Sequence, residues 1–370
     1  MEKEFIYPNF EHSNLNISAT LAEFLGAPNK KAVIEPLKKE LEKGYKNVVF
    51  ICFDGMGVHP MRQNFVDDNI LTKNVKDILT STFPSTTTNA TNSLLQNKLP
   101  SEHGWFGWSL NFYKMNRNIN IFLNTDSWTS EPVEITDSPL DEVEFYFDKA
   151  KSNYEINTVL PPYVKVKHPE RNYTFSGLYE FGDYIKEVCD KDGRQFVYAY
   201  YPDPDATMHD YGVTSPEAQA VLEDIAELVE NLYKETKDTI FIISADHGQV
   251  DIEGWIPLYE DKEIMDMLEI YPYLEARAAC FKVKEDKKQE FEKVFNSKYS
   301  EDFILYKSSD LIEKGLFGGK GDKCYLLGDY IAIGTYTHKT MLLNPSSHKF
   351  KGHHTSLTEE MEVPLIVLKN

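Results

Sequence analysis

Acidic residues and histidines recur in this sequence where apolar, β-prone runs end. Three such runs, 47–53, 195–201 and 239–245, are followed by Asp54, by Asp205 and His209, and by Asp246 and His247. Carboxylate oxygens and imidazole nitrogens are the ligands that zinc and similar ions take in proteins. Because parallel strands bring their carboxyl ends to the same edge of a sheet, the pattern predicts that these side chains converge there on a metal site. One aspartate in a turn indicates little by itself. Three strands that each end in this way are much less likely to arise by chance.

A cluster of hydroxyl side chains precedes a second helical pattern. Phe83-Pro84 is followed by Ser85 and three threonines, and Thr88 or Asn89 is the expected N-cap of the helix beyond. The first N–H groups of a helix and its dipole favour an anion. Three threonines alone are more often a turn and cap, but beside a metal site they suggest a nucleophile or a phosphate cradle.

The bulk composition limits the possible functions. The chain has 370 residues with 59 Asp+Glu against 39 Lys+Arg, a formal charge of −20. Such a surface repels nucleic-acid duplexes and anionic membranes, so neither is an expected partner. Four scattered cysteines without a CxxC pair, and a sequence without a signal peptide or an apolar run of 18 residues, favour a cytoplasmic protein. The oligomeric state stays open.

Alternation of strands and helices predicts an α/β fold with a mostly parallel, doubly wound sheet and helices on both faces. A capping box at Thr20–Glu23 would begin one short helix in an N-terminal arm over residues 1–30. From residue 255 the sequence pattern changes, which predicts a small α+β insert at 255–319. The catalytic core would then comprise 1–254 and 320–370, and it would resume with a strand near 330–336. Residues 126–175 give no clear period.

The ordered motifs FDGMG, FPSTTT, LPSEHG, PDPDATMHDYG, SADHG and GHHTSLTEEM resemble the type I phosphodiesterase/nucleotide pyrophosphatase family of the alkaline phosphatase superfamily, in particular its short bacterial members. The resemblance spans roughly residues 45–370. It implies an alkaline phosphatase-like fold, two divalent metal ions, and a threonine nucleophile that forms a covalent phosphoenzyme. Zinc is the first choice of metal, with manganese or iron as alternatives.

Carried over motif by motif, the resemblance makes Thr87 the nucleophile. One metal ion would be held by Asp205, His209 and His354, with His353 as the fallback for the last ligand. The other would be held by Asp54, Asp246 and His247, with the Thr87 oxygen between the two ions.

Two departures from the family concern the substrate. An asparagine that helps bind the phosphoryl oxygen in animal members falls near Trp108 here, so the backbone N–H of Thr88 would take over that contact. Trp105 and Trp108 are candidates for lining a pocket for a base or an apolar leaving group, although aromatic residues near a core more often only pack. None of the five arginines lies in a recognisable motif, so no bidentate phosphate clamp can be named, which favours diesters or pyrophosphates over monoesters.

The leading hypothesis is therefore a hydrolase of phosphodiester or pyrophosphate bonds acting on a small phosphoester or nucleotide. The alternatives are a phosphomonoesterase or phosphonate hydrolase on the same site, and a catalytically dead nucleotide-binding protein. The last is disfavoured because buried carboxylates are costly without a cation.

Overall fold

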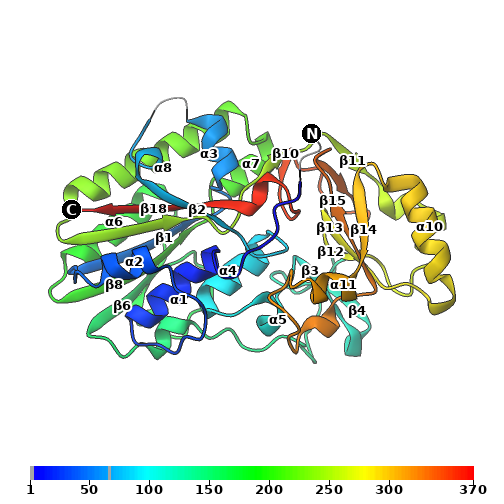
Figure 1. Cartoon of the computed structure of the whole chain (residues 1–370), viewed down its shortest axis with the longest axis horizontal. Helices are drawn as coiled ribbons and strands as arrows, with labels where there is room; N and C mark the ends of the chain where they lie inside the picture. The colour runs from blue at the N-terminus through cyan, green and yellow to red at the C-terminus, as the bar shows by residue number, and fades with distance from the viewer. Residues whose placement is uncertain (1–3, 66–67) are drawn as a thin grey trace.

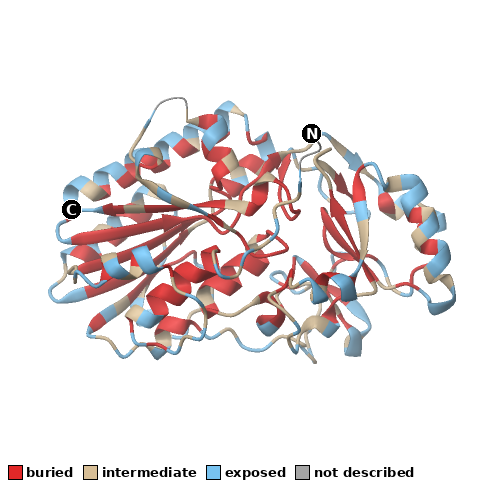
Figure 2. Cartoon of the chain, viewed as in Figure 1, coloured by how far each residue is buried: buried red, intermediate tan, exposed pale blue. Residues whose placement is uncertain are grey.

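Two seven-stranded sheets, each with its own hydrophobic core, organise the chain (Figures 1 and 2). The computed structural model describes residues 4–65 and 68–370, so residues 1–3 of the expected N-terminal arm lie outside the described residues. The first sheet has the strand order β2 (Val75–Thr80), β18 (Glu362–Lys369), β9 (Thr239–Ser244), β1 (Asn47–Phe53), β8 (Arg194–Tyr201), β6 (Tyr154–Val159) and β7 (Asn172–Tyr173).

Strands β9, β1, β8, β6 and β7 of the first sheet pair in parallel, which confirms the expected α/β fold with a mostly parallel sheet. The register sets Phe53 of β1 beside Tyr201 of β8, and Cys52 beside Ser244 of β9. The three strands thus end nearly level, and the polar residues that follow them start from one edge. Strand β18 pairs antiparallel with both β2 and β9.

Two groups of helices cover this sheet on opposite sides (Figure 1). One comprises α1 (Asn14–Phe24), α2 (Glu35–Leu41) and α4 (Thr87–Gln96); the other comprises α3 (Val58–Asn64), α6 (Leu178–Asp190) and α8 (Pro216–Glu235). Helix α8 begins where expected: Pro216 takes the first helical position and the Ser215 Oγ accepts a hydrogen bond from the Ala218 N–H. Its buried stripe, which includes Leu222, Ile225 and Val229, packs on the sheet.

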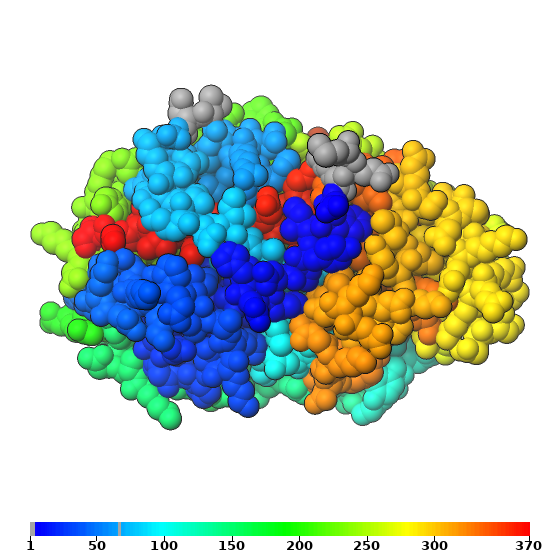
Figure 3. Space-filling view, viewed as in Figure 1, coloured from blue at the N-terminus to red at the C-terminus, as the bar shows by residue number. Residues whose placement is uncertain are grey.

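The second sheet is antiparallel and lies on the right in Figure 1. Its strand order is β14 (Phe303–Lys307), β15 (Tyr330–Gly334), β13 (Ala278–Phe281), β12 (Tyr273–Glu275), β3 (Ser109–Phe112), β4 (Arg117–Asn120) and β5 (Thr125–Asp126). Around it lie α5 (Pro100–His103), α9 (Lys262–Met265), α10 (Lys288–Tyr299) and α11 (Ser308–Glu313). In the space-filling view the N-terminal arm crosses the junction between the two halves (Figure 3).

Short elements complete the chain. Two two-stranded ladders pair β10 (Val250–Asp251) with β17 (Gly352–His353), and β11 (Gly254–Ile256) with β16 (Lys339–Met341). Helix α7 (Asp205–Tyr211) follows β8. Single 3-10 turns lie at Thr72–Asn74, Tyr113–Met115, Tyr146–Lys149, Pro169–Arg171, Leu258–Glu260, Glu285–Lys287, Cys324–Leu326 and Glu359–Met361. No helix in the described part of the chain has the length and apolar character needed to cross a lipid bilayer.

Several local expectations differ from the structure. Helix α1 begins at Asn14 behind the cap Ser13, so Thr20 lies inside it and caps nothing; its hydroxyl instead donates to the Asn16 carbonyl. The unassigned stretch 126–175 contains β6, whose Asn and Thr residues interrupt the apolar pattern. Strand β15, where the core was expected to resume, lies in the second sheet between β14 and β13. That sheet also takes β3, β4 and β5 from outside the insert expected at 255–319, whose boundaries stay a prediction.

Candidate metal centre

Glycines allow the three strand ends to approach each other closely. Gly55, directly after Asp54, has φ +71°, and a Cβ there would lie 2.9 Å from the Asp205 Cβ. A Cβ at Gly57 would lie 2.4 Å from the Gly248 Cα. The glycines of the FDGMG and SADHG motifs therefore bring the acidic residues of β1, β8 and β9 within contact distance.

One buried cluster consists of Asp54, Asp246 and His247. The His247 Nε2 lies 3.3 Å from the Asp54 Oδ1 and 3.5 Å from the Asp246 Oδ2. The Asp246 Oδ1 is anchored by the backbone N–H groups of Gly55 at 3.1 Å and of His247 at 2.9 Å. The Asp246 Oδ2 accepts no hydrogen bond from the described residues, although it is buried. A buried carboxylate oxygen left in this state is suited to a cation.

A second cluster consists of Asp205, His247 and His354, and a third consists of His209, His353 and His354. Asp205 is the first residue of helix α7, and His209 lies one turn later. The two side chains therefore share one face of the helix, as their spacing predicted. The His209 Nε2 is 3.3 Å from the Asp205 Oδ2, and the His354 Nε2 is 3.6 Å from the Asp205 Oδ1. Ligand atoms from distant parts of the chain thus meet around Asp205.

The imidazole rings of His209, His247 and His354 are all held by the same device. Each ring places its Nδ1 against a backbone carbonyl: Gly352 at 2.8 Å, Gly248 at 2.9 Å and Ser85 at 3.0 Å, respectively. A carbonyl can only accept, so each Nδ1 carries the proton and each Nε2 of the neutral ring keeps its lone pair. Metal-binding histidines are oriented in this way, and here all three Nε2 atoms face carboxylates.

The carboxyl groups repel each other in the absence of a cation. Burial, followed by the charges of Asp246 and Asp205, raises the pKa of Asp54 well above its usual range. Burial also raises the pKa of Asp246. Asp205 behaves differently: burial raises its pKa, but the combined effects of His209, His247 and Gln249 outweigh burial and bring the pKa to about 2. Clustered buried carboxyls, three aligned Nε2 atoms and an unpartnered oxygen all fit divalent cations.

Thr87 lies at the start of α4, directly against the first cluster. Its Oγ1 is 3.1 Å from the His247 Nε2 and 3.2 and 3.3 Å from the two Asp54 oxygens. The N-cap is Thr86, two or three residues earlier than the sequence suggested, so Thr87 is the first helical residue. A hydroxyl at this position lies beside the unpaired N–H groups of the first turn.

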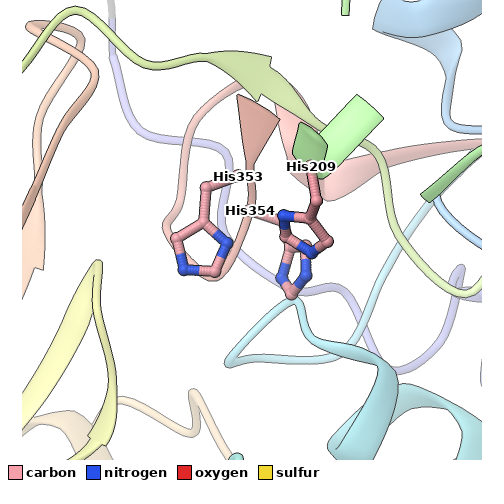
Figure 4. A group of neighbouring side chains, drawn as sticks. All are labelled: His209, His353 and His354. Atoms are coloured by element: carbon pink, nitrogen blue, oxygen red, sulfur yellow. The ribbon is translucent and has the colours of Figure 1, made fainter. Parts of the chain in front are cut away.

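The two adjacent histidines have different surroundings. His354 is anchored to Ser85 and lies near Asp205, whereas the buried Nδ1 of His353 has no partner among the described residues. The ring centres of His354 and His247 are 4.0 Å apart. The rings of His353 and His354 both lie near His209, with ring centres 5.2 and 5.1 Å from that of His209 (Figure 4). Both adjacent histidines therefore remain candidates for the last ligand.

The expected substrate residues lie near the threonines. Thr88 is fully buried and its Oγ1 lacks a partner among the described residues, so a contact with substrate would have to come from its backbone N–H. Trp108 is 42% exposed and meets Phe122 edge-on, and Trp105 is half-buried against the same ring. These aromatic residues form an accessible surface on the second sheet.

Sequence reasoning missed three further residues of the site. The Tyr200 hydroxyl donates to Asp54, and the Gln249 amide donates to Asp205. Both flank motifs that were recognised, but tyrosine and glutamine carry no metal-ligand signature. Glu275 is buried on β12 and accepts a hydrogen bond from Thr86 at 2.9 Å. Its stretch of sequence contains no local signal, because only the contact between the two sheets brings it to the site.

A parallel sheet with clustered Asp and His residues at its carboxyl edge, beside a threonine at a helix start, defines a hydrolase of the alkaline phosphatase superfamily. The family model described as type I phosphodiesterase/nucleotide pyrophosphatase matches residues 48–356. The chain belongs to this family and is a hydrolase of its phosphodiesterase/nucleotide pyrophosphatase type. Comparison with curated protein sequences gives no match.

Solved structures share the fold at low sequence identity. Murine ectonucleotide pyrophosphatase/phosphodiesterase 5 matches with a TM-score of 0.65 and 18% identity over 87% of this chain and 88% of that one. An inactive threonine-to-alanine variant of the same protein, in complex with AMP, matches with a TM-score of 0.63 and 18% identity over 87% of each chain. Phosphonoacetate hydrolase from Sinorhizobium meliloti, in complex with phosphonoacetate, matches with a TM-score of 0.60 and 14% identity over 87% of this chain and 89% of that one.

Proposed function

We propose that this protein hydrolyses phosphodiester or pyrophosphate bonds of small molecules through a covalent phosphothreonine at Thr87. The observation that carries the proposal is the position of the Thr87 Oγ1, 3.1 Å from the His247 Nε2 and 3.2 Å from Asp54 at the start of a helix. Asp54, Asp246 and His247 would hold one divalent cation, and Asp205, His209 and His354 the other. When bound, such ions supply Lewis acidity that favours the ionised hydroxyl and the leaving oxygen.

The proposed reaction proceeds through two successive displacements at phosphorus. In the first, the Thr87 Oγ1 attacks phosphorus, the bond to the leaving oxygen breaks, and the hydroxyl proton is released to solvent. The N–H groups at the start of α4 face the phosphoryl oxygens and stabilise the developing charge. In the second, water attacks the phosphothreonine, the Thr87–phosphorus bond breaks, and the phosphorylated product leaves with threonine restored.

The charge of the site favours diesters over monoesters. Among the described residues, no lysine or arginine side chain makes a hydrogen bond or ion pair with the proposed ligands or with Thr87. A monoester carries a second negative charge, which such a clamp would ordinarily neutralise. The murine relative with AMP bound makes a nucleotide a reasonable first substrate to try.

The test compares a chromogenic phosphodiester with the matching phosphomonoester, using protein stripped by a chelator and protein refilled with zinc. We expect diester hydrolysis that disappears on stripping and returns with zinc. Thr87→Ala should lower kcat by at least about 10³-fold while zinc binding persists, because the nucleophile is lost and the side-chain ligands are kept.

The Thr91→Ala variant provides a matched control, since the Thr91 hydroxyl only donates back to the Thr87 carbonyl within the helix. It should retain activity. Wild-type turnover by Thr87→Ala would eliminate the covalent mechanism. A preference for the monoester, or activity on a phosphonate alone, would instead support the alternative hydrolases.

A further inference from the structure

A buried carboxyl group from the second sheet adjoins the proposed nucleophile. Glu275 ends β12 and is 5% exposed. Its Oε1 accepts hydrogen bonds from the Thr86 hydroxyl at 2.9 Å and from the Trp108 N–H at 2.6 Å. Thr86 is the N-cap of α4, and the residue after it is Thr87. Glu275 is therefore fixed one residue from the proposed site of bond formation.

The surrounding backbone accommodates this carboxyl closely. A Cβ at Gly107 would lie 3.0 Å from the Glu275 Cγ, so the glycine admits the side chain. Leu274, directly before it, has φ +85°, a backbone conformation that side chains other than glycine rarely adopt. Unusual backbone of this kind persists where its surroundings hold it, and it is concentrated at functional sites.

The hydrogen bonds to Glu275 do not neutralise its charge. Both donors are neutral groups and both bind Oε1; in the described part of the chain Oε2 accepts no hydrogen bond and no lysine or arginine pairs with the carboxyl. Burial raises the pKa of Glu275 to about 7, and His209 and Asp205 are among the groups whose charges act on it. Two of the proposed metal ligands thus lie close enough to Glu275 for their charges to act on it.

A count of charges indicates how the Glu275 carboxyl would affect the binding of phosphoryl groups. Two divalent cations would bring four positive charges, and the three ligand carboxylates Asp54, Asp205 and Asp246 together with an ionised Thr87 oxygen would balance them. An ionised Glu275 would then add one uncompensated negative charge beside the site. The electrostatic attraction between the site and a phosphoryl group then decreases. The decrease is larger for a group with two negative charges than for a group with one.

We propose that Glu275 is a specificity-determining residue, whose carboxylate disfavours doubly charged phosphoryl groups and so selects the singly charged phosphorus of diesters and of internal anhydride links. The inference rests on the function proposed above and narrows its substrate class. It also gives the Trp108 position a role: its backbone N–H is occupied in holding Glu275. A purely structural role, in which the carboxyl only ties the α4 cap to the 105–108 loop, makes a different prediction.

Glu275→Gln separates the two roles. The amide keeps an oxygen that can accept from Thr86 and Trp108, but it has no charge. Glu275→Ala removes both properties, and Glu313→Gln, an exposed residue on α11, removes the same unit of charge far from the site. Calorimetry on the zinc-loaded proteins would measure binding of inorganic phosphate, at a pH where it is doubly charged, and of dimethyl phosphate. The ratio of kcat/KM for the chromogenic monoester and diester would be measured alongside.

We expect Glu275→Gln to bind inorganic phosphate about tenfold more tightly, with dimethyl phosphate changed by less than about threefold. The monoester-to-diester ratio should rise by about tenfold, and Glu313→Gln should alter neither measurement. Phosphate binding that is unchanged or weaker in Glu275→Gln overturns the proposal and leaves Glu275 a structural role. If wild type hydrolyses neither ester, the proposed function fails, yet the phosphate titration still decides the role of Glu275.

Discussion

At the scale of single residues, the two adjacent histidines differ in how their imidazole rings are held. The His354 Nδ1 is 3.0 Å from the Ser85 carbonyl, so its Nε2 is free to bind, whereas the His353 Nδ1 has no partner among the described residues. The side chain that is anchored before the metal arrives loses less entropy on binding.

This difference predicts distinct metal contents. We expect His354→Ala to lose one of two zinc ions, with an affinity loss exceeding the roughly 10- to 100-fold caused by removing an outer partner. His353→Ala should retain both ions. Elemental analysis after dialysis, followed by competition with a chromogenic chelator, would measure this. Full zinc content in His354→Ala and a deficit in His353→Ala would reverse the assignment.

A third histidine provides a test of stability against pH. His103 is buried; its Nδ1 accepts from the Trp105 N–H at 2.9 Å and its Nε2 lies 2.9 Å from the Ser93 Oγ. Burial lowers the pKa of His103 from 6.5 to about 3. Below pH 6.5 the unfolded chain takes up a proton that the folded chain refuses, so stability falls as the pH drops from about 6.5 towards 3.

Replacing this ring should therefore make the acid side of the stability profile shallower. We expect His103→Gln to cost about 1–3 kcal/mol at neutral pH, because buried hydrogen bonds are lost. The dependence of its unfolding free energy on pH should be less steep than in wild type, by up to about 1.4 kcal/mol per pH unit in that window. Urea unfolding at several pH values would measure both effects. The partly exposed His168, changed to Gln, is the control, and parallel profiles for wild type and His103→Gln would contradict this explanation.

At the scale of elements, a buried ion pair joins the second sheet to the loop that carries His354. The guanidinium of Arg277 and the carboxylate of Glu360 are both fully buried, with the Arg277 Nε 3.3 Å from the Glu360 Oε1. Arg277 also uses its backbone N–H, which donates to the Thr355 Oγ1 at 3.2 Å. Thr355 has φ +89°, a conformation that costs a β-branched residue about 1–3 kcal/mol and needs such support.

Breaking this pair should disturb the metal site from a distance. Arg277→Met leaves a buried charge on Glu360, and we expect a loss of about 3–5 kcal/mol of unfolding free energy. Zinc affinity should fall about 10- to 100-fold as His354 loses its support. The double variant Arg277→Met/Glu360→Gln should lose less stability than the two single changes summed.

Chemical denaturation and zinc competition would supply both measurements. Lys149→Met, which breaks the exposed pair with Glu144, should cost no more than about 1 kcal/mol. If the two single changes proved additive, the pair would not act as a unit.

The sequence predicts these elements unevenly. Strands β1, β8 and β9 are continuous apolar runs, and their polar ends predict Asp54, Asp205 and Asp246 because position along a parallel strand sets position at the edge of the sheet. Strand β6 was not predicted because Asn157 and Thr158 interrupt its apolar pattern. Glu275 and Arg277 could not be placed, since their roles arise only from contact between the two sheets, which no local periodicity encodes.

At the scale of the whole molecule, a surplus of acidic groups matches a protein that concentrates carboxylates around cations. Of the formal charge of −20, the proposed ligands Asp54, Asp205 and Asp246 carry a share that bound ions would offset. The composition argued against nucleic-acid duplexes as partners but could not reveal that the second sheet is assembled from separate stretches of chain.

The place of β18 also bears on how the protein is made. This strand comes after all the other strands of both sheets in the described part of the chain, yet it lies inside the first sheet, between β2 and β9. While the chain is still growing from the ribosome, β2 has no neighbour in that sheet and His354 has not yet been translated. A nascent chain would expose an open strand edge and an incomplete set of ligands until β18 and His354 have emerged. Metal capture should therefore follow, and report, the emergence of this last part of the two sheets.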